Sequence, residues 1–208
     1  MTIILIVITA FISIICFGNR NLFEKLQFNP YRVYHNKEYY RLITHAFVHA
    51  DWIHLFVNMF VLYSFGRALE FFLALHGNSL HFSPVVIYLA LYLSSTIVSS
   101  LTTLKKYRDV FNYNAVGASG AVASVLFACI FFDPWMKLGL YLVIPVPGII
   151  FGVLYLWYSN YMSKKSGDNI NHDAHFLGAI YGITFPVLLN PELFYEFIKL
   201  LTNPHFSL

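Results

Sequence analysis

The chain has 208 residues, of which 58% are hydrophobic and 11% are charged. A typical soluble domain carries about 25% charged residues, so this composition excludes a disordered chain and argues against a soluble globular one. The net charge of +3 is spread thinly along the chain, which leaves no basic patch suited to nucleic acid. We therefore expect an integral membrane protein.

Six apolar runs are candidates for membrane spans, since a helix needs about 20 mostly apolar residues to cross a bilayer core. They cover about residues 1–17, 52–72, 84–104, 116–132, 138–158 and 174–189. The short alternating segments of a membrane barrel are not visible. We predict an all-α membrane protein, a six-transmembrane-helix bundle. The first run lacks the basic start and cleavage site of a secretory signal, so we expect it to be retained.

The domain organisation predicted from these runs is one membrane domain over residues 1–190 and a short C-terminal tail over 191–208. Cys16 and Cys129 lie inside apolar runs and are interpreted as small buried hydrophobic residues. The first loop, residues 18–44, mixes aromatic with basic side chains. That mixture is typical of a segment lying in the membrane interface, although an aromatic-rich linker would have the same composition.

Histidines cluster around the start of the second run. His54 and Asn58 are four residues apart and share one helix face inside the span, where polar side chains are costly and indicate function. His45 and His49 come before the span, and Asp51 marks its start. For these two histidines we favour a structural interpretation, with rings satisfied by backbone carbonyls.

Small residues open the fourth run as Gly117-Ala118-Ser119-Gly120. They permit close helix approach, and a serine at a helix N-terminus can present its hydroxyl beside free N–H groups. In the sixth run, His175, Gly178 and Gly182 share one face, and the two glycines form a GxxxG pair. If that pair packs on the fourth run, His175 reaches Ser119.

These groups could together perform acyl transfer. Serine needs an adjacent base, commonly histidine, to become a strong nucleophile. His54, Asn58 and the Ser119 N–H could stabilise a developing oxyanion. Asp173 is two residues from His175 and points to another helix face. We therefore expect a Ser–His dyad without an orienting carboxylate.

The sequence resembles the rhomboid family of intramembrane serine proteases. The resemblance rests on His49-x4-His54-x3-Asn58, on Gly117-Ala118-Ser119-Gly120 and on Ala174-His175-x2-Gly178-x3-Gly182, in the second, fourth and sixth runs. Tyr40-Arg41 and the Gly66-x3-Glu70 spacing are weaker matches. The resemblance implies a rhomboid-like bundle with an interfacial first loop.

By this resemblance Ser119 is the nucleophile and His175 the general base, with His54, Asn58 and Ser119 forming the oxyanion hole. Gly117, Gly120, Gly178, Gly182, Arg41 and Glu70 would give structural support. The substrates would be transmembrane proteins, cleaved in the lipid bilayer without a metal or cofactor. The expected location is a multi-pass position in a bacterial inner membrane.

One position departs from well-known members of the family. They carry an aromatic residue four positions after the serine, stacked on the catalytic histidine, whereas this chain has Ala123. Another feature must therefore orient His175. The fifth run contains Pro145, Pro147 and Gly148, which indicate either a loosely packed lateral gate or a simple bend.

Two other functions remain open from the sequence. A membrane metalloenzyme could use the histidines at 45, 49, 54, 172 and 175, but it gives Ser119 no role. A non-catalytic rhomboid-like protein could bind membrane clients, although such proteins typically lack the serine or the histidine. A channel or transporter would need repeated halves or paired intramembrane charges, which are not visible.

Overall fold

The computed structural model describes the whole chain except residues 81, 141–143, 166–169 and 205–208. It is mostly helical. The helices, in chain order, are α1 (Thr2–Gly18), α2 (Arg20–Leu26), α3 (Pro30–His35), α4 (Arg41–Thr44), the 3-10 turn η1 (His45–Phe47), α5 (Trp52–Leu75), α6 (Gly77–Leu80), α7 (Pro84–Tyr107), α8 (Ser119–Phe132), α9 (Gly148–Met162), α10 (His172–Leu189) and α11 (Leu193–Thr202).

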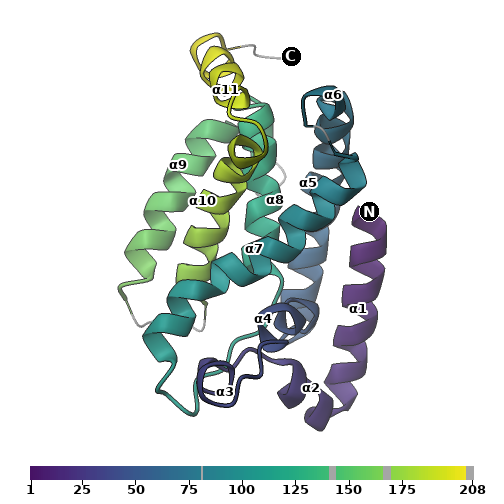
Figure 1. Cartoon of the computed structure of the whole chain (residues 1–208), viewed down its shortest axis with the longest axis vertical. Helices are drawn as coiled ribbons and strands as arrows, with labels where there is room; N and C mark the ends of the chain where they lie inside the picture. Colours follow the sequence, from purple (N-terminus) through teal and green to yellow (C-terminus); the bar gives the residue numbers. More distant parts are fainter. Residues whose placement is uncertain (81, 141–143, 166–169, 205–208) are drawn as a thin grey trace.

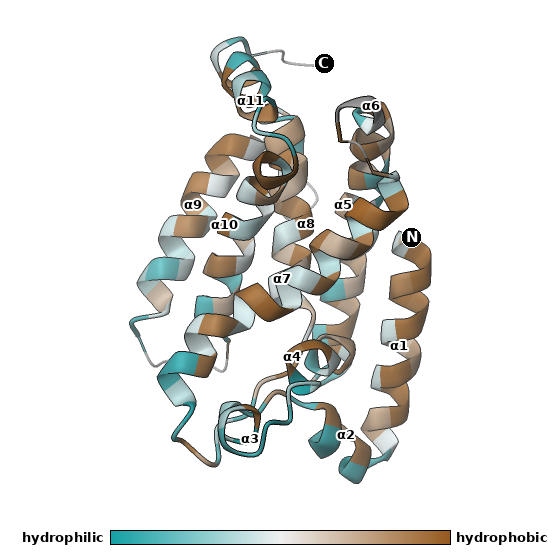
Figure 2. Ribbon diagram, viewed as in Figure 1, coloured by the Kyte–Doolittle hydropathy of each residue, from teal (hydrophilic) through white to brown (hydrophobic). Residues whose placement is uncertain are grey.

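Helix α8 is the centre of the bundle, packed against α5, α7, α9 and α10 (Figure 1). Every residue from Gly120 to Phe132 is buried. A helix surrounded on all sides has no need of a polar face, and α8 carries none. Many large apolar residues of α1, α5 and α9 are exposed, and the ribbons of these helices are largely coloured as hydrophobic in Figure 2, as expected for a membrane protein.

Two helices, α5 and α7, are long and apolar enough to cross a membrane by length and composition. α1 and α8 are shorter apolar helices. Side-chain caps fix where three of the core helices begin. Asp51 accepts the His54 N–H at 2.8 Å, Ser83 precedes Pro84 at the start of α7, and Asn171 accepts the Ala174 N–H at 3.2 Å.

The expectation of a helix in the fifth run is wrong for residues 138–140 and 144–147, while residues 141–143 lie outside the described part of the chain. Residues Lys137–Leu140 (β1) and Ile144–Pro147 (β2) pair as antiparallel strands, and α9 begins only at Gly148. The protein is therefore not purely α-helical. Pro145 and Pro147 lie in β2, before the helix, so they do not bend it.

The first loop is folded into α2, α3 and α4, which gather with the following η1 at one end of the bundle, while α6 and α11 lie at the other (Figure 1). The predicted tail contains α11. Its Phe197 stacks on Phe131 of α8 at a centroid distance of 5.1 Å, and Trp135 donates to the Leu200 carbonyl at 3.2 Å. Cys16 and Cys129 are buried and free, as predicted.

Candidate active site

One cavity of about 1530 Å³ brings together the residues singled out in the sequence. His54 and Asn58 reach it from α5, Ser119 from the start of α8, and His175 from the first turn of α10. The cavity also contains Tyr155 of α9. Four helices thus contribute polar groups to one space.

Ser119 is the first residue of α8. The first hydrogen bond of that helix runs from the Val122 N–H to the Ala118 carbonyl, at 2.9 Å. The N–H groups of Ser119, Gly120 and Ala121 precede this first bond and are not used by the helix itself. Such N–H groups at a helix N-terminus favour negative charge nearby. Ser119 is only partly buried, so its hydroxyl group is accessible from the cavity.

Gly117 makes the turn into α8 possible. Its φ of +115° lies in a region that other residues rarely adopt. A methyl group at this position would also lie 2.6 Å from Cε1 of the His54 ring. The glycine thus allows the backbone before Ser119 to pass directly against His54.

Helices α8 and α10 touch backbone to backbone. A methyl group at Gly178 would lie 2.2 Å from the Gly120 carbonyl oxygen, and one at Gly182 would lie 2.2 Å from that of Ser124. Ser124 donates its hydroxyl to the Gly178 carbonyl at 2.7 Å. The predicted GxxxG contact is therefore confirmed, and it sets Ser119 and His175 at the same end of a close helix pair.

The first turn of α10 is anchored to α7. Asn171 caps α10 and accepts the Thr103 hydroxyl at 3.0 Å. Asp173 forms an ion pair with Lys106 of α7 at 3.4 Å, so its carboxylate interacts with that lysine. The ring of Tyr155 lies beside that of His175, with centroids 6.3 Å apart and planes inclined by 24°.

His54 and Asn58 are joined within α5. The Asn58 side-chain amide, which is buried, donates to the His54 carbonyl at 2.9 Å. An amide nitrogen carries two N–H donors, and this bond uses one of them. The first two turns of α5 therefore present an imidazole and an amide toward the cavity.

His49 is fully buried and connects α1 to the turn before Ser119. The Ser13 hydroxyl donates to the Phe47 carbonyl at 2.9 Å, so Ser13 Oγ accepts from His49 Nδ1–H at 3.0 Å. This tautomer leaves Nε2 to accept the Ala118 N–H at 3.4 Å. The expectation of a backbone carbonyl partner is wrong for His49, because its partners are a hydroxyl and an N–H.

His45 matches the structural interpretation. Its Nδ1 donates to the Arg41 carbonyl at 2.8 Å, and its own carbonyl accepts the Gly117 N–H at 3.0 Å. Burial lowers the pKa of His45 to about 4, although the bond to Arg41 acts in the opposite direction. Burial, with a smaller effect of His54, lowers the pKa of His49 to about 3. Both rings are neutral at physiological pH.

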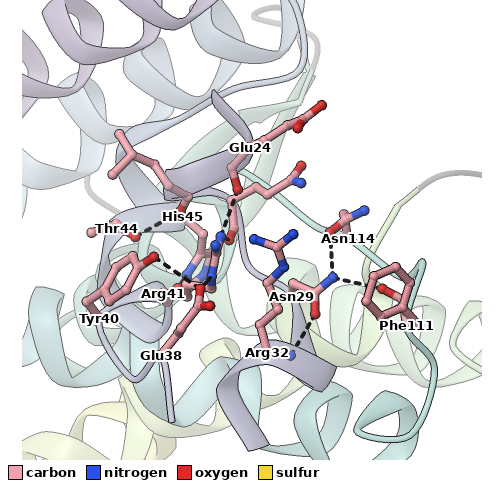
Figure 3. Close-up of polar contacts among 12 residues, drawn as sticks. Glu24, Asn29, Arg32, Glu38, Tyr40, Arg41, Thr44, His45, Phe111 and Asn114 are labelled. Atoms are coloured by element: carbon pink, nitrogen blue, oxygen red, sulfur yellow. Dashed lines mark hydrogen bonds and ion pairs between the residues drawn. The ribbon is translucent and has the colours of Figure 1, made fainter. Parts of the chain in front are cut away.

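Arg41 fastens the first loop from a buried position (Figure 3). Its guanidinium donates to the carbonyls of Glu24 and Gln27, both at 2.8 Å, and pairs with Glu38. Burial alone would raise the pKa of the Glu38 carboxyl, but the Arg41 contact leaves it below its usual value. These bonds hold α2 and α4 together.

The first loop is also bonded to the segment that leads into Ser119. Asn29 donates to the Asn114 side chain at 2.9 Å and to the Phe111 carbonyl at 3.0 Å (Figure 3). Phe28 and Ala115 exchange backbone hydrogen bonds of 2.9 Å. The position of the turn before Ser119 therefore depends on the first loop.

Gly66 and Glu70 lie on α5, away from the cavity. A methyl group at Gly66 would lie 2.4 Å from the Tyr88 hydroxyl and 2.7 Å from Thr2. Glu70 accepts the Thr2 N–H at 2.8 Å and pairs with Arg67 at 2.7 Å. Their contacts join α1, α5 and α7.

Sequence reasoning missed Ser13 and Tyr155. A lone serine in an apolar run and one tyrosine among many carry no signal of their contacts.

In the described part of the chain, no three His, Cys, Asp or Glu side chains form a group that could hold a metal ion.

The fold and cavity define a helical membrane protein with a polar site. A model of the rhomboid domain matches residues 36–192. The chain is 31% identical over 153 residues to RHOMBOID-like protein 12, mitochondrial, of Arabidopsis thaliana, covering 66% of this chain and 43% of that protein. It is 33% identical over 150 residues to Rhomboid protein 1, mitochondrial, of Saccharomyces cerevisiae, covering 69% and 40%.

A third relative, Rhomboid-like protein 11, chloroplastic, of Arabidopsis thaliana, is 30% identical over 174 residues, covering 76% of this chain and 55% of its own length. The chain spans about half the length of the curated relatives it matches. It belongs to the rhomboid family and is an integral membrane protein. Members of this family are generally intramembrane serine proteases that act on transmembrane substrates.

Proposed function

We propose that the protein is an intramembrane serine endopeptidase that cleaves transmembrane segments with a Ser119–His175 dyad. His54, Asn58 and the Ser119 N–H would form the oxyanion hole. The observation that carries this proposal is the contact of Gly120 with Gly178, which sets Ser119 and His175 at one end of a helix pair beside the same cavity. Family membership supports the same chemistry.

The reaction follows from the groups present. Ser119 Oγ attacks the scissile carbonyl carbon while His175 takes its proton. The tetrahedral oxyanion accepts hydrogen bonds from the first-turn N–H and from the α5 side chains. When the C–N bond breaks, His175 gives the proton to the leaving amine. Water then attacks the acyl-enzyme, with His175 again as base, and releases the carboxylate and the serine.

The membrane arrangement follows from the same proposal. Of the six predicted spans, α5 and α7 pass the test of length and composition, and we propose that α1, α8, α9 and α10 complete the bundle. The first loop would then lie in the interface. A bacterial inner membrane stays a prediction without support, since the relatives are named as mitochondrial or chloroplastic.

The test is labelling of the detergent-solubilised protein by a fluorophosphonate, which reacts with activated serines. We expect labelling of the parent and its loss in Ser119→Ala and His175→Ala. Ser64→Ala is the matched control, because Ser64 is an exposed serine bonded only to its own helix at Phe60. Circular dichroism and gel filtration must show all four proteins folded.

Two results would redirect the proposal. A folded parent that takes up no label, yet retains a membrane client on a column, would indicate a client-binding protein. Activity that survives Ser119→Ala and is abolished by a chelator would indicate a metalloenzyme.

A further inference from the structure

The general base proposed above has a ring neighbour from another helix. Tyr155 of α9 lies nearly parallel to His175 of α10, at a centroid distance of 6.3 Å and an angle of 24°. Aromatic pairs interact at centroid distances of about 4.5–7 Å. Both residues line the cavity that contains Ser119.

The Tyr155 ring is itself held in place. Phe127 of α8 lies 5.3 Å from it, and Phe151, one turn earlier on α9, lies 5.8 Å from it. Gly152 allows α9 to approach α8, because a methyl group there would lie 3.3 Å from the Phe127 ring. The tyrosine therefore reaches His175 only while α9 is seated against α8.

The residue one turn after Ser119 is small. Ala123 lines the same cavity and offers no ring to His175. His172 contacts His175 edge-on at 5.9 Å, but it belongs to the same helix and moves with it. Tyr155 thus fixes the imidazole relative to a different part of the bundle.

We propose that Tyr155 is a positioning residue that holds the His175 imidazole ready to accept the Ser119 proton, so that alignment of the base depends on α9 being docked. This inference rests on the proposed serine protease function. α9 lies at the edge of the bundle, with Val153, Leu154 and Trp157 exposed on its outer side. Moving α9 aside to admit a substrate would separate the two rings, and its return would restore the base.

The experiment measures the rate constant of fluorophosphonate labelling, since a small probe does not need α9 to move. Tyr155→Leu should lower it about three- to tenfold, the size expected when a ring contact that orients a catalytic group is lost. Tyr155→Phe keeps the ring and should label at the parent rate. Tyr161→Leu is the matched control, because Tyr161 lies on the same helix, 44% exposed and stacked on Trp157.

Cleavage of a transmembrane peptide gives a second readout. Tyr155→Leu should lower kcat and leave KM within about twofold, since substrate contacts are kept while the chemical step slows. Each rate is divided by the amount of folded protein, measured as the amount that carries the label when the reaction is complete. If Tyr155→Leu does not fold, Tyr155→Met, which fills the space with a flexible chain, takes its place.

Three results would overturn the inference: a parent-like rate in Tyr155→Leu, an equal loss in Tyr155→Phe, or an equal loss in Tyr161→Leu. The first removes the role of the residue, the second assigns the effect to the hydroxyl, and the third assigns it to general packing of α9. Each presupposes that the parent labels at Ser119. Failure of the proposed function is distinguishable, because the parent itself would then remain unlabelled.

Discussion

At the residue scale, two buried histidines hold the backbone that precedes Ser119. The His45 carbonyl binds the Gly117 N–H at 3.0 Å, and His49 Nε2 accepts the Ala118 N–H at 3.4 Å. The His49 ring also contacts that of His54, edge-on at 5.0 Å. The neutral His49 ring therefore contacts both the turn before Ser119 and His54, a proposed oxyanion donor.

Replacing His49 with leucine should destabilise the protein and slow labelling of Ser119. The substitution leaves the buried Ala118 N–H without its acceptor, which costs about 1–3 kcal/mol. His49→Gln is the control, because an amide can still accept from Ala118 and donate to Ser13. Thermal unfolding in detergent and the labelling rate would be measured for both. Equal losses in the two variants would contradict the hydrogen-bond argument.

Acid should destabilise the fold through the same histidines. Free histidine titrates near pH 6.5, whereas His45 has a pKa of about 4 in the folded protein. Between these values the unfolded chain binds more protons, so stability falls as the pH is lowered through this window and is unaffected above it. Melting temperatures from pH 7.5 to 4.5 would show this fall.

Two variants separate this effect from general acid sensitivity. His45→Gln should flatten the pH dependence of the melting temperature, whereas His35→Gln, at an exposed histidine beside Asp109, should not. If the melting temperature depends on pH equally in the parent and in His45→Gln, His45 is not the origin of the acid sensitivity.

Most of the individual candidate site residues could be predicted from the sequence. Polar side chains inside apolar runs are conspicuous, which is why Ser119, His175, His54 and Asn58 could be named. Their partners could not be named. Ser13 reaches His49 across 36 positions of the chain, and Tyr155 contacts His175 from a separate helix. Such contacts depend on how the helices are arranged, which spacing within one run does not determine.

At the element scale, the decisive contact is that of α8 with α10. The GxxxG spacing predicted a close contact, and the small-residue run indicated its partner. The hairpin of β1 and β2 was not predicted, because its residues are as apolar as those of α9 and continue the same run. Local composition does not distinguish a strand from a helix in a short apolar segment.

Gly178→Ala should force α8 and α10 apart. Its methyl group would lie 2.2 Å from the Gly120 carbonyl, and overpacking of this kind costs about 1–3 kcal/mol or more. Labelling of Ser119 should fall steeply although the Ser119 and His175 side chains of the proposed dyad remain. Gly18→Ala is the matched control, since nothing lies within 4 Å of a methyl group there. A folded Gly178→Ala with parent labelling would refute the role of this contact.

At the scale of the whole molecule, the arrangement determines which substrates can react. A transmembrane helix hides its peptide bonds in its own hydrogen bonds, so on the proposed mechanism it must unwind locally before Ser119 can attack. We expect cleavage near helix-weakening residues such as glycine or proline. Two reconstituted substrates of equal length, one with a Gly-Pro pair and one rich in leucine, would test this. Equal cleavage of both would contradict it.

The shortness of α8 has a consequence for the supply of water. Its 14 residues span about 21 Å at 1.5 Å per residue, against a hydrocarbon core of about 30 Å. If α8 crosses the core as proposed, with Phe132 at one boundary, Ser119 would lie roughly 9 Å inside the other. The cavity that Ser119 lines would then have to supply water at that depth. On the proposed mechanism, lipids or ligands that exclude water from this cavity would block hydrolysis of the acyl-enzyme, and the substrate fragment would stay attached to Ser119.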